Sequence, residues 1–157
     1  MRNVTICILL KEDKILLGVK KRGFGSGKYT CFGGKLKEGE NLEQGAIREL
    51  FEEVGIIVRK EFLEKKAELT FKFPYNESWS QIAHVYLIRN WDGEPIESEE
   101  MKPEWFYVRD MPYSKMWESD SYWMSHVLQG KYVVASFTYG QNNEVLENKV
   151  KIDSTKN

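Results

Sequence analysis

Residues 33–56 constrain the fold of this chain more than any other stretch, because they combine a glycine pair, a charged turn and an amphipathic helix. In the helix, Glu49, Glu52 and Glu53 are spaced at i, i+3 and i+4, so their carboxylates lie within about 100° of one another. Like charges at this spacing destabilise a helix unless a cation lies among them. Hard cations such as Mg²⁺ bind carboxylate oxygens. The pattern therefore favours a metal site over a solvated acidic face.

The two ends of this helix can also be predicted. Asn41 is a good N-cap, and Gln44 three residues later completes a capping-box pattern. Gly55 stands where a C′ glycine ends a helix, and residues 56–58 are typical of a strand. One face is expected to pack against the core through Ala46, Ile47, Leu50, Phe51 and Val54.

Apolar runs on both sides of the helix predict a sheet. Residues 4–10 are almost continuously apolar, as in a strand buried on both faces, whereas residues 67–73 alternate as in a half-buried strand. The other predicted strands are residues 15–19, 81–88, 105–108, 132–139 and 145–152, of which the last two form a hairpin. A second helix is expected in the later part of residues 116–128. Strands and helices do not alternate strictly, so the sequence predicts an α/β fold with a mixed sheet and helices on its faces.

Residues 20–28 form a basic loop with three glycines. Cations and exposed backbone N–H groups suit phosphate, although this glycine spacing matches neither a P-loop nor a dinucleotide fingerprint. By itself the loop is typical of a flexible, solvated segment. Because it directly precedes the predicted metal site, we expect it to contact phosphate or substrate.

Composition indicates a globular protein in a reducing compartment. With 157 residues, 41% hydrophobic and 30% charged, one domain is expected over residues 1–153, followed by a loose tail of residues 154–157. The net charge of −1 favours neither nucleic acid nor a membrane as partner. Cys7 and Cys31 form no disulfide framework, and no apolar run approaches a membrane span, so a cytoplasmic location is expected.

The helix and its leading loop carry a family pattern. The chain matches every fixed position of the Nudix box, G-x5-E-x7-R-E-U-x-E-E-x-G-U with U apolar, from Gly34 to Ile56. It therefore resembles the Nudix hydrolases. This resemblance implies an α/β/α sandwich with a central mixed sheet, and hydrolysis of a diphosphate with Mg²⁺, for which Mn²⁺ is an alternative. The flanking segments that resemble, more loosely, the branch acting on oxidised purine nucleoside triphosphates are residues 20–25, 32–35, 100–103 and 116–123.

The same resemblance implies roles for the acidic residues. The implied metal ligands are the main-chain carbonyl of Gly33 and the carboxylates of Glu49, Glu52, Glu53 and Glu100. Arg48 is implied to orient the carboxylates through an ion pair with Glu49 or Glu52. One carboxylate takes the proton of the attacking water, and spacing leaves Glu52, Glu53 and Glu100 all open as the base.

Further positions match the substrate site of that branch. The implied substrate contacts are Thr5, Lys20, Phe32, Gly33, Gly34 and Lys35. The implied walls of the base pocket are Phe71, Phe73, Met101, Trp117 and Trp123. For Phe71 and Phe73 the alternative is ordinary core packing. Asp120 matches a carboxylate that hydrogen-bonds the purine, although an aspartate in such a setting is most often a helix N-cap.

Two positions depart from that branch. Thr30 stands in place of an asparagine that contacts the base, and Ser119 stands in place of the first of two adjacent aspartates. A threonine hydroxyl lacks the paired donor and acceptor of an amide, and the loss of a carboxylate removes an acceptor. Because buried hydrogen bonds discriminate strongly between ligands, these two positions bear on which base is preferred.

The sequence therefore predicts Mg²⁺-dependent hydrolysis of oxidised or modified purine nucleoside triphosphates, such as 8-oxo-dGTP and 2-oxo-dATP, to the monophosphate and pyrophosphate. One alternative is a Nudix enzyme acting on ADP-ribose, a dinucleoside polyphosphate or an alkylated purine nucleotide. Another is a catalytically silent nucleotide-binding module, against which the complete set of glutamates argues. The expected partner is a small nucleotide, and the expected state is a monomer, with a dimer left open.

Overall fold

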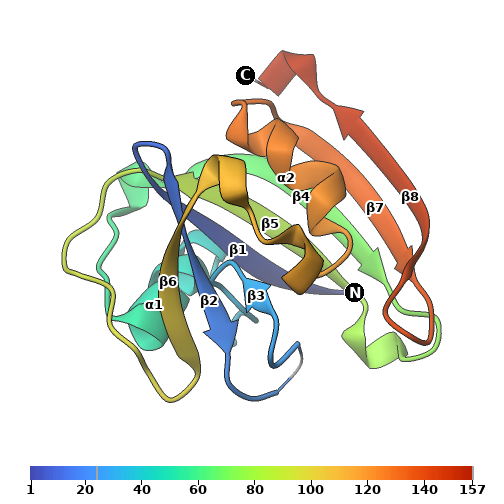
Figure 1. Cartoon of the computed structure of the whole chain (residues 1–157), viewed down its shortest axis with the longest axis horizontal. Coiled ribbons are helices and arrows are strands. Elements are labelled where there is room, and N and C mark those ends of the chain that lie inside the picture. The colour runs from blue at the N-terminus through green and yellow to red at the C-terminus, as the bar shows by residue number, and fades with distance from the viewer. Residues whose placement is uncertain (24, 157) are drawn as a thin grey trace.

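The computed structural model describes residues 1–23 and 25–156 of the chain (Figure 1). Strands, two α-helices and short 3-10 turns follow one another in the described residues. The strands are β1 (Arg2–Lys11), β2 (Lys14–Lys20), β3 (Tyr29–Thr30), β4 (Glu64–Lys72), β5 (Gln81–Ile88), β6 (Met101–Tyr107), β7 (Val133–Tyr139) and β8 (Val145–Ile152). The α-helices are α1 (Leu42–Val54) and α2 (Asp120–Leu128).

The strands join into one mixed sheet. Its order is β3-β2-β1-β5-β4-β7-β8, and β6 pairs with β2. β1 is parallel to β5 and β4 is parallel to β7, whereas the remaining neighbours are antiparallel. The predicted mixed sheet and the closing β7–β8 hairpin are therefore confirmed.

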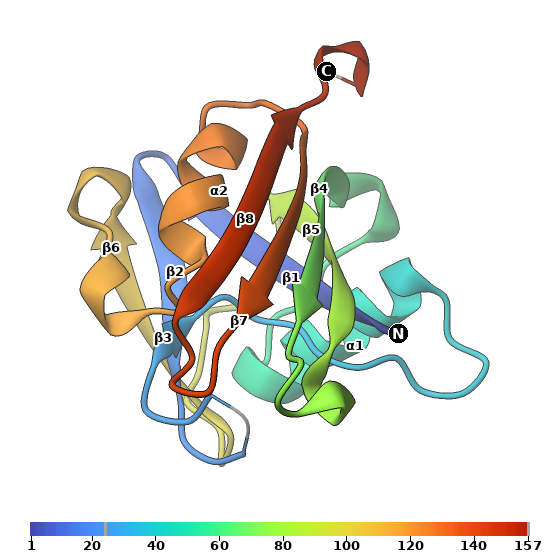
Figure 2. The same cartoon turned by 90° about the vertical axis from the view of Figure 1, so that its right-hand side faces the viewer.

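The two α-helices cover opposite faces of the sheet (Figure 2). Successive side chains of a strand point to opposite faces, so β1 contributes to two separate cores. Cys7 and Leu9 lie in the core beneath α1, and Ile8 and Leu10 lie in the core beneath α2. The expected α/β/α sandwich is confirmed.

Helix α1 begins and ends as its sequence predicts. Asn41 Oδ1 accepts from the Gln44 N–H at 2.8 Å, and the Asn41 N–H donates to Gln44 Oε1 at 3.0 Å, which completes the capping box. Gly55 adopts the left-handed conformation with φ 72°, and its N–H donates to the Phe51 carbonyl. Local sequence alone therefore defines this helix.

Two expectations around this helix are wrong. Phe51 is 58% exposed, because the sheet contacts the side of α1 that carries Leu50 and Val54 and leaves the flank with Phe51 uncovered. Residues 56–58 form no strand: Ile57 makes a single bridge to Asp92, through two backbone hydrogen bonds of 3.0 and 2.8 Å. One bridge to a loop aligns too few residues to continue a ladder.

Other boundaries shift where pairing reaches further than the apolar pattern. β6 begins at Met101, well before the predicted residue 105, because it pairs with β2 along its whole length. In the tail, residues Ser154–Lys156 form a short 3-10 turn. Phe24 of the basic loop and Asn157 of the tail lie outside the described residues. Within the described part of the chain, no helix combines the length and apolarity needed to cross a membrane.

The separation of β1 from β2 positions the site. These strands pair only beside their turn, where Leu9 lies opposite Leu16. Further along they diverge, and residues 29–35 fill the gap: β3 pairs with β2, while Phe32 and Lys35 bridge to β1. The inserted segment carries the glycine pair to the edge of β1.

Candidate active site and metal centre

A cavity of about 530 Å³ lies between the first half of β1, the inserted segment and the ends of β4 and β7. It gathers residues that are far apart in the chain. The sequence-predicted residues that line it are Thr5, Lys20, Thr30, Phe32, Gly33, Gly34, Lys35, Glu53, Phe71, Phe73, Met101, Trp117, Ser119 and Asp120. Those that do not line it are Arg48, Glu49, Glu52, Glu100 and Trp123.

Backbone geometry holds the glycine pair against β1. The Thr5 N–H donates to the Gly34 carbonyl at 2.9 Å, and the Gly33 N–H donates to Glu53 Oε1 at 2.8 Å. Gly33 has a φ of 132°, and a Cβ at this residue would lie 2.0 Å from the Thr5 carbonyl oxygen. Conformation and space therefore both require glycine. The Gly33 backbone is fixed beside the Glu53 carboxyl group.

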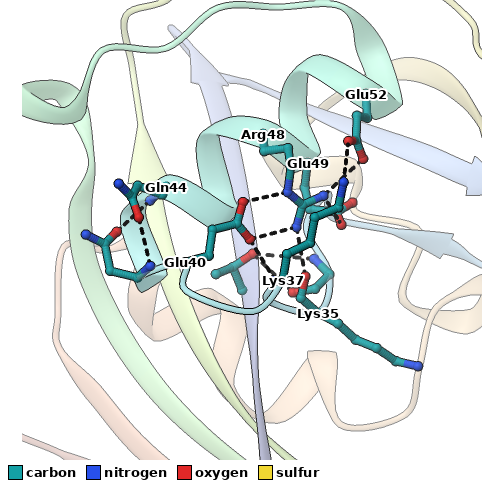
Figure 3. A network of polar contacts seen from close by, with 10 residues as sticks. Lys35, Lys37, Glu40, Gln44, Arg48, Glu49 and Glu52 are labelled. Carbon is teal, nitrogen blue, oxygen red and sulfur yellow. Dashed lines mark hydrogen bonds and ion pairs between the residues drawn. The ribbon is translucent and has the colours of Figure 1, made fainter.

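The guanidinium of Arg48 connects the acidic helix to the loop before it (Figure 3). Its Nε and Nη2 donate to Glu40 at 2.7 and 3.0 Å, and Nη1 donates to Glu49 and Glu52, both at 3.0 Å. Nη2 also donates to the Lys35 carbonyl at 3.0 Å. Sequence analysis left Glu49 and Glu52 as alternative partners; the structure shows both. It adds Glu40 as a bidentate partner, whose pKa these hydrogen bonds lower to about 2.

We expect Arg48→Ala to lower the free energy of unfolding by about 2 to 3 kcal/mol, because Glu40 and Glu49 lose charge-assisted hydrogen bonds in a partly buried position. Urea denaturation of the metal-free protein measures this change. Arg22→Ala is the matched control, since Arg22 is exposed and lies 3.8 Å from Glu99. It should change the free energy of unfolding by less than about 0.5 kcal/mol. Equal losses in both variants would contradict the connecting role.

Glu53 points from the same helix into the protein and is only 4% exposed. Burial raises the pKa of its carboxyl to about 8, and the nearby charges of Glu49 and Glu100 raise it further. The Gly33 N–H and the charge of Lys20 act in the opposite direction but are weaker than burial. Acidic groups are thus concentrated around a buried position where positive charge is scarce.

This donor set fits a divalent cation. Carboxylates and a main-chain carbonyl are the hard oxygen ligands that Mg²⁺ takes, and a cation would neutralise the charge around Glu53. Within the described residues, no three acidic, histidine or cysteine side chains already converge as a metal cluster, in a conformation where Arg48 holds Glu49 and Glu52. Metal binding therefore requires these side chains to turn away from Arg48.

The opposite end of the cavity is walled by aromatic rings. The ring of Tyr139 stacks on Phe73 with centroids 4.9 Å apart, and Trp117 meets Tyr139 edge-on at 5.5 Å. The ammonium of Lys28 lies 5.3 Å from the Trp117 ring centroid. Phe71 and Phe73 line the cavity and also belong to the core beneath α2, so both interpretations of these residues hold. Such walls suit a flat heteroaromatic ligand.

Asp120 places a carboxyl group at this aromatic end. It is the first residue of α2, and Ser119 occupies the N-cap position, so the N-cap interpretation of Asp120 is wrong. Burial raises the pKa of Asp120 to about 7. The Trp123 Nε1–H donates to Asp120 Oδ1 at 3.2 Å. Trp123 itself is fully buried behind Asp120, and not on the cavity wall where the resemblance had placed it.

Sequence analysis missed Tyr139, whose side chain lines the cavity. Tyr139 ends β7, and β7 lies beside β4 with Phe137 opposite Phe71. Strand order therefore brings Tyr139 to Phe71 and Phe73. The signal that could have found it is the alternation of Phe137 and Tyr139 with polar residues, which marks both as inward-facing.

Comparison with known proteins was made for the whole chain. The NUDIX domain model matches residues 1–127. The chain is 39% identical to the oxidized purine nucleoside triphosphate hydrolase of Danio rerio, over 94% of this chain and 92% of that protein. It is 38% identical to the protein of the same name from Mus musculus, over 98% and 97% of the two chains. Its fold is similar to the crystal structure of a MutT protein from Bacillus halodurans, with a TM-score of 0.84, 26% identity and coverage of 96% and 98%.

Proposed function

The chain belongs to the Nudix hydrolase family, and on that premise we propose that it hydrolyses oxidised purine nucleoside triphosphates to the monophosphate and pyrophosphate. One observation carries the proposal: a single cavity joins Glu53 and the glycine pair at one end to aromatic walls with Asp120 at the other. The first end suits a phosphate chain with its cation, and the second suits a base. The names of the relatives from Danio rerio and Mus musculus support this assignment.

At the phosphate end, the proposal divides the work among charged groups. Lys20 lines the cavity and holds the outer phosphates by charge attraction. Gly33, Glu49, Glu52, Glu53 and Glu100 are the proposed ligands of Mg²⁺, or of Mn²⁺ in its place. Bound there, the cation supplies charge neutralisation of the phosphates and acidification of the attacking water. The proton of that water passes to Glu52, Glu53 or Glu100.

At the base end, Trp117 and Phe73 provide apolar surface and Asp120 provides hydrogen bonding. Because burial raises the pKa of Asp120 to about 7, its carboxyl exists in both protonation states near neutral pH. The ionised form accepts a hydrogen bond from the base, and the neutral form also donates one. Asp120 therefore recognises polar groups on the base edge, while the aromatic walls accept any flat ring.

We place this reaction in the cytoplasm, with a small nucleotide as the partner of a monomeric enzyme. Cys7 and Cys31 are both free thiols, which suits a reducing compartment. The proposed substrate belongs to the soluble nucleotide pool, so the activity amounts to removal of damaged nucleotides before polymerases use them.

A substrate panel tests the proposal and separates it from its rivals. The protein is assayed with Mg²⁺ and 8-oxo-dGTP, 2-oxo-dATP, dGTP, ATP or ADP-ribose. We expect the highest kcat/KM for the oxidised purine triphosphates, with pyrophosphate as the second product. A preference for ADP-ribose would assign the chain to another Nudix activity. Nucleotide binding without any hydrolysis would identify a silent module.

Asp120→Ala is expected to lower kcat/KM for oxidised purine triphosphates by roughly tenfold or more, because the base loses its carboxyl partner in a buried pocket. Steady-state pyrophosphate release measures the effect. Asp110→Ala is the control, since Asp110 is exposed and does not line the cavity. An unchanged kcat/KM in folded Asp120→Ala would mean that Asp120 makes no contact with the base.

A further inference from the structure

We propose that Ser119 and Tyr139 form a hydroxyl pair that determines base specificity by presenting a fixed hydrogen-bond donor beside Asp120. The inference rests on the proposed function, because it concerns how the same cavity recognises a base. Both residues line that cavity. Ser119 precedes the first turn of α2, and Tyr139 ends β7, so the pair joins a helix to the sheet.

Two hydrogen bonds connect the residues. The Ser119 N–H donates to the Tyr139 oxygen at 3.1 Å, and the Tyr139 hydroxyl donates to Ser119 Oγ at 2.5 Å. Each residue is only 1% exposed, so bulk water does not compete for these bonds. The tyrosine ring is held by its stack on Phe73 and its edge contact with Trp117. Packing, and not the ligand, therefore sets the position of the phenol oxygen.

The pattern of bonds determines where the protons lie. A backbone N–H can only donate, so the Tyr139 oxygen accepts from Ser119 and directs its own proton to Ser119 Oγ. Burial raises the pKa of Tyr139 above its ordinary value, so the phenol keeps this proton at neutral pH. Ser119 Oγ accepts that proton with one lone pair, and its own hydroxyl proton points elsewhere. The Ser119 hydroxyl is thereby left as a donor in the cavity wall.

A donor at this position changes which base edge fits. The family resemblance led us to expect a second carboxylate here, which would accept hydrogen bonds from the base. A donor at Ser119 beside an ionised Asp120 instead matches an acceptor next to a donor on the base. Guanine carries a carbonyl acceptor where adenine carries an amino donor. With that position facing Ser119, the pair favours oxidised guanine over oxidised adenine.

The test measures the ratio of kcat/KM for 8-oxo-dGTP to that for 2-oxo-dATP. Tyr139→Phe keeps the stacked ring but releases the Ser119 hydroxyl, and Ser119→Ala removes the donor. We expect each variant to lower the ratio by roughly fivefold or more. The double variant should lower it no further than the larger single effect, because the two hydroxyls act as one unit. Ser119→Thr keeps a hydroxyl and should retain most of the ratio.

Tyr132→Phe is the matched control, since Tyr132 is buried but does not line the cavity, and its ratio should equal that of the wild type. Thermal unfolding confirms that each variant is folded. An unchanged ratio in both single variants of an active enzyme overturns this inference alone. An equal slowing of both substrates does the same, because it reveals a purely structural role. A wild-type protein that hydrolyses neither substrate overturns the proposed function together with the inference.

Discussion

Glu53→Gln is expected to reduce turnover roughly a thousandfold or more while leaving the fold intact. The carboxylate is the most buried of the acidic residues proposed to hold the cation, and the amide cannot carry its charge. The fold tolerates the change, because the glutamine oxygen can still accept the Gly33 N–H that now bonds Glu53 Oε1. A neutral side chain also removes the cost of burying a charge at this position.

Pyrophosphate release and thermal unfolding, each with and without Mg²⁺, measure these effects. In the wild type, Mg²⁺ should raise the melting temperature, because it binds the folded state only; in Glu53→Gln this rise should be lost. Glu43→Gln is the matched control, since Glu43 lies in the first turn of the same helix, near Lys60 and away from the cavity. Normal Mg²⁺-dependent turnover by folded Glu53→Gln would refute the assigned metal centre.

Gly33→Ala should reduce stability and activity together. The substitution forces a side chain into a φ of 132° and places its Cβ 2.0 Å from the Thr5 carbonyl oxygen. Because the obstacle is backbone, the segment must move away from β1, at a cost of about 2 to 4 kcal/mol. The displacement also moves the N–H that bonds Glu53, so we expect kcat/KM to fall by roughly a hundredfold or more.

Gly39→Ala separates conformational strain from the steric clash. Gly39 also has a positive φ, 81°, but a Cβ there would meet nothing within 4 Å. It should therefore cost only about 1 to 2 kcal/mol, seen by urea denaturation, and leave kcat/KM near that of the wild type. If both alanine variants had equal losses of stability and activity, close packing against Thr5 would not be the reason for glycine at residue 33.

Local chemistry explains why the helix and the acidic face could be predicted. The Asn41–Gln44 capping box and the Gly55 terminator act within one or two turns, so they depend little on the rest of the fold. The spacing of Glu49, Glu52 and Glu53 likewise follows from helical geometry alone. Strand periodicity located most of the sheet in the same way.

Other features depended on contacts between distant segments. The exposure of Phe51 follows from which flank of α1 the sheet covers, and the single bridge of Ile57 follows from the position of Asp92. The place of Trp123 behind Asp120, instead of on the cavity wall, results from how α2 packs on the sheet. Residue type and periodicity predict that such side chains are apolar, but not what lies opposite them.

By itself the sequence determined the helix, its ends, the row of carboxylates and the mixed α/β character, because each depends on neighbours a few residues apart. Tertiary structure decided the cavity, since only the divergence of β1 from β2 lets residues 29–35 place Gly33 against Thr5 and Glu53. It also decided the pairing of Ser119 with Tyr139, which no local pattern encodes. Those two residues meet because strand order brings the end of β7 to the start of α2.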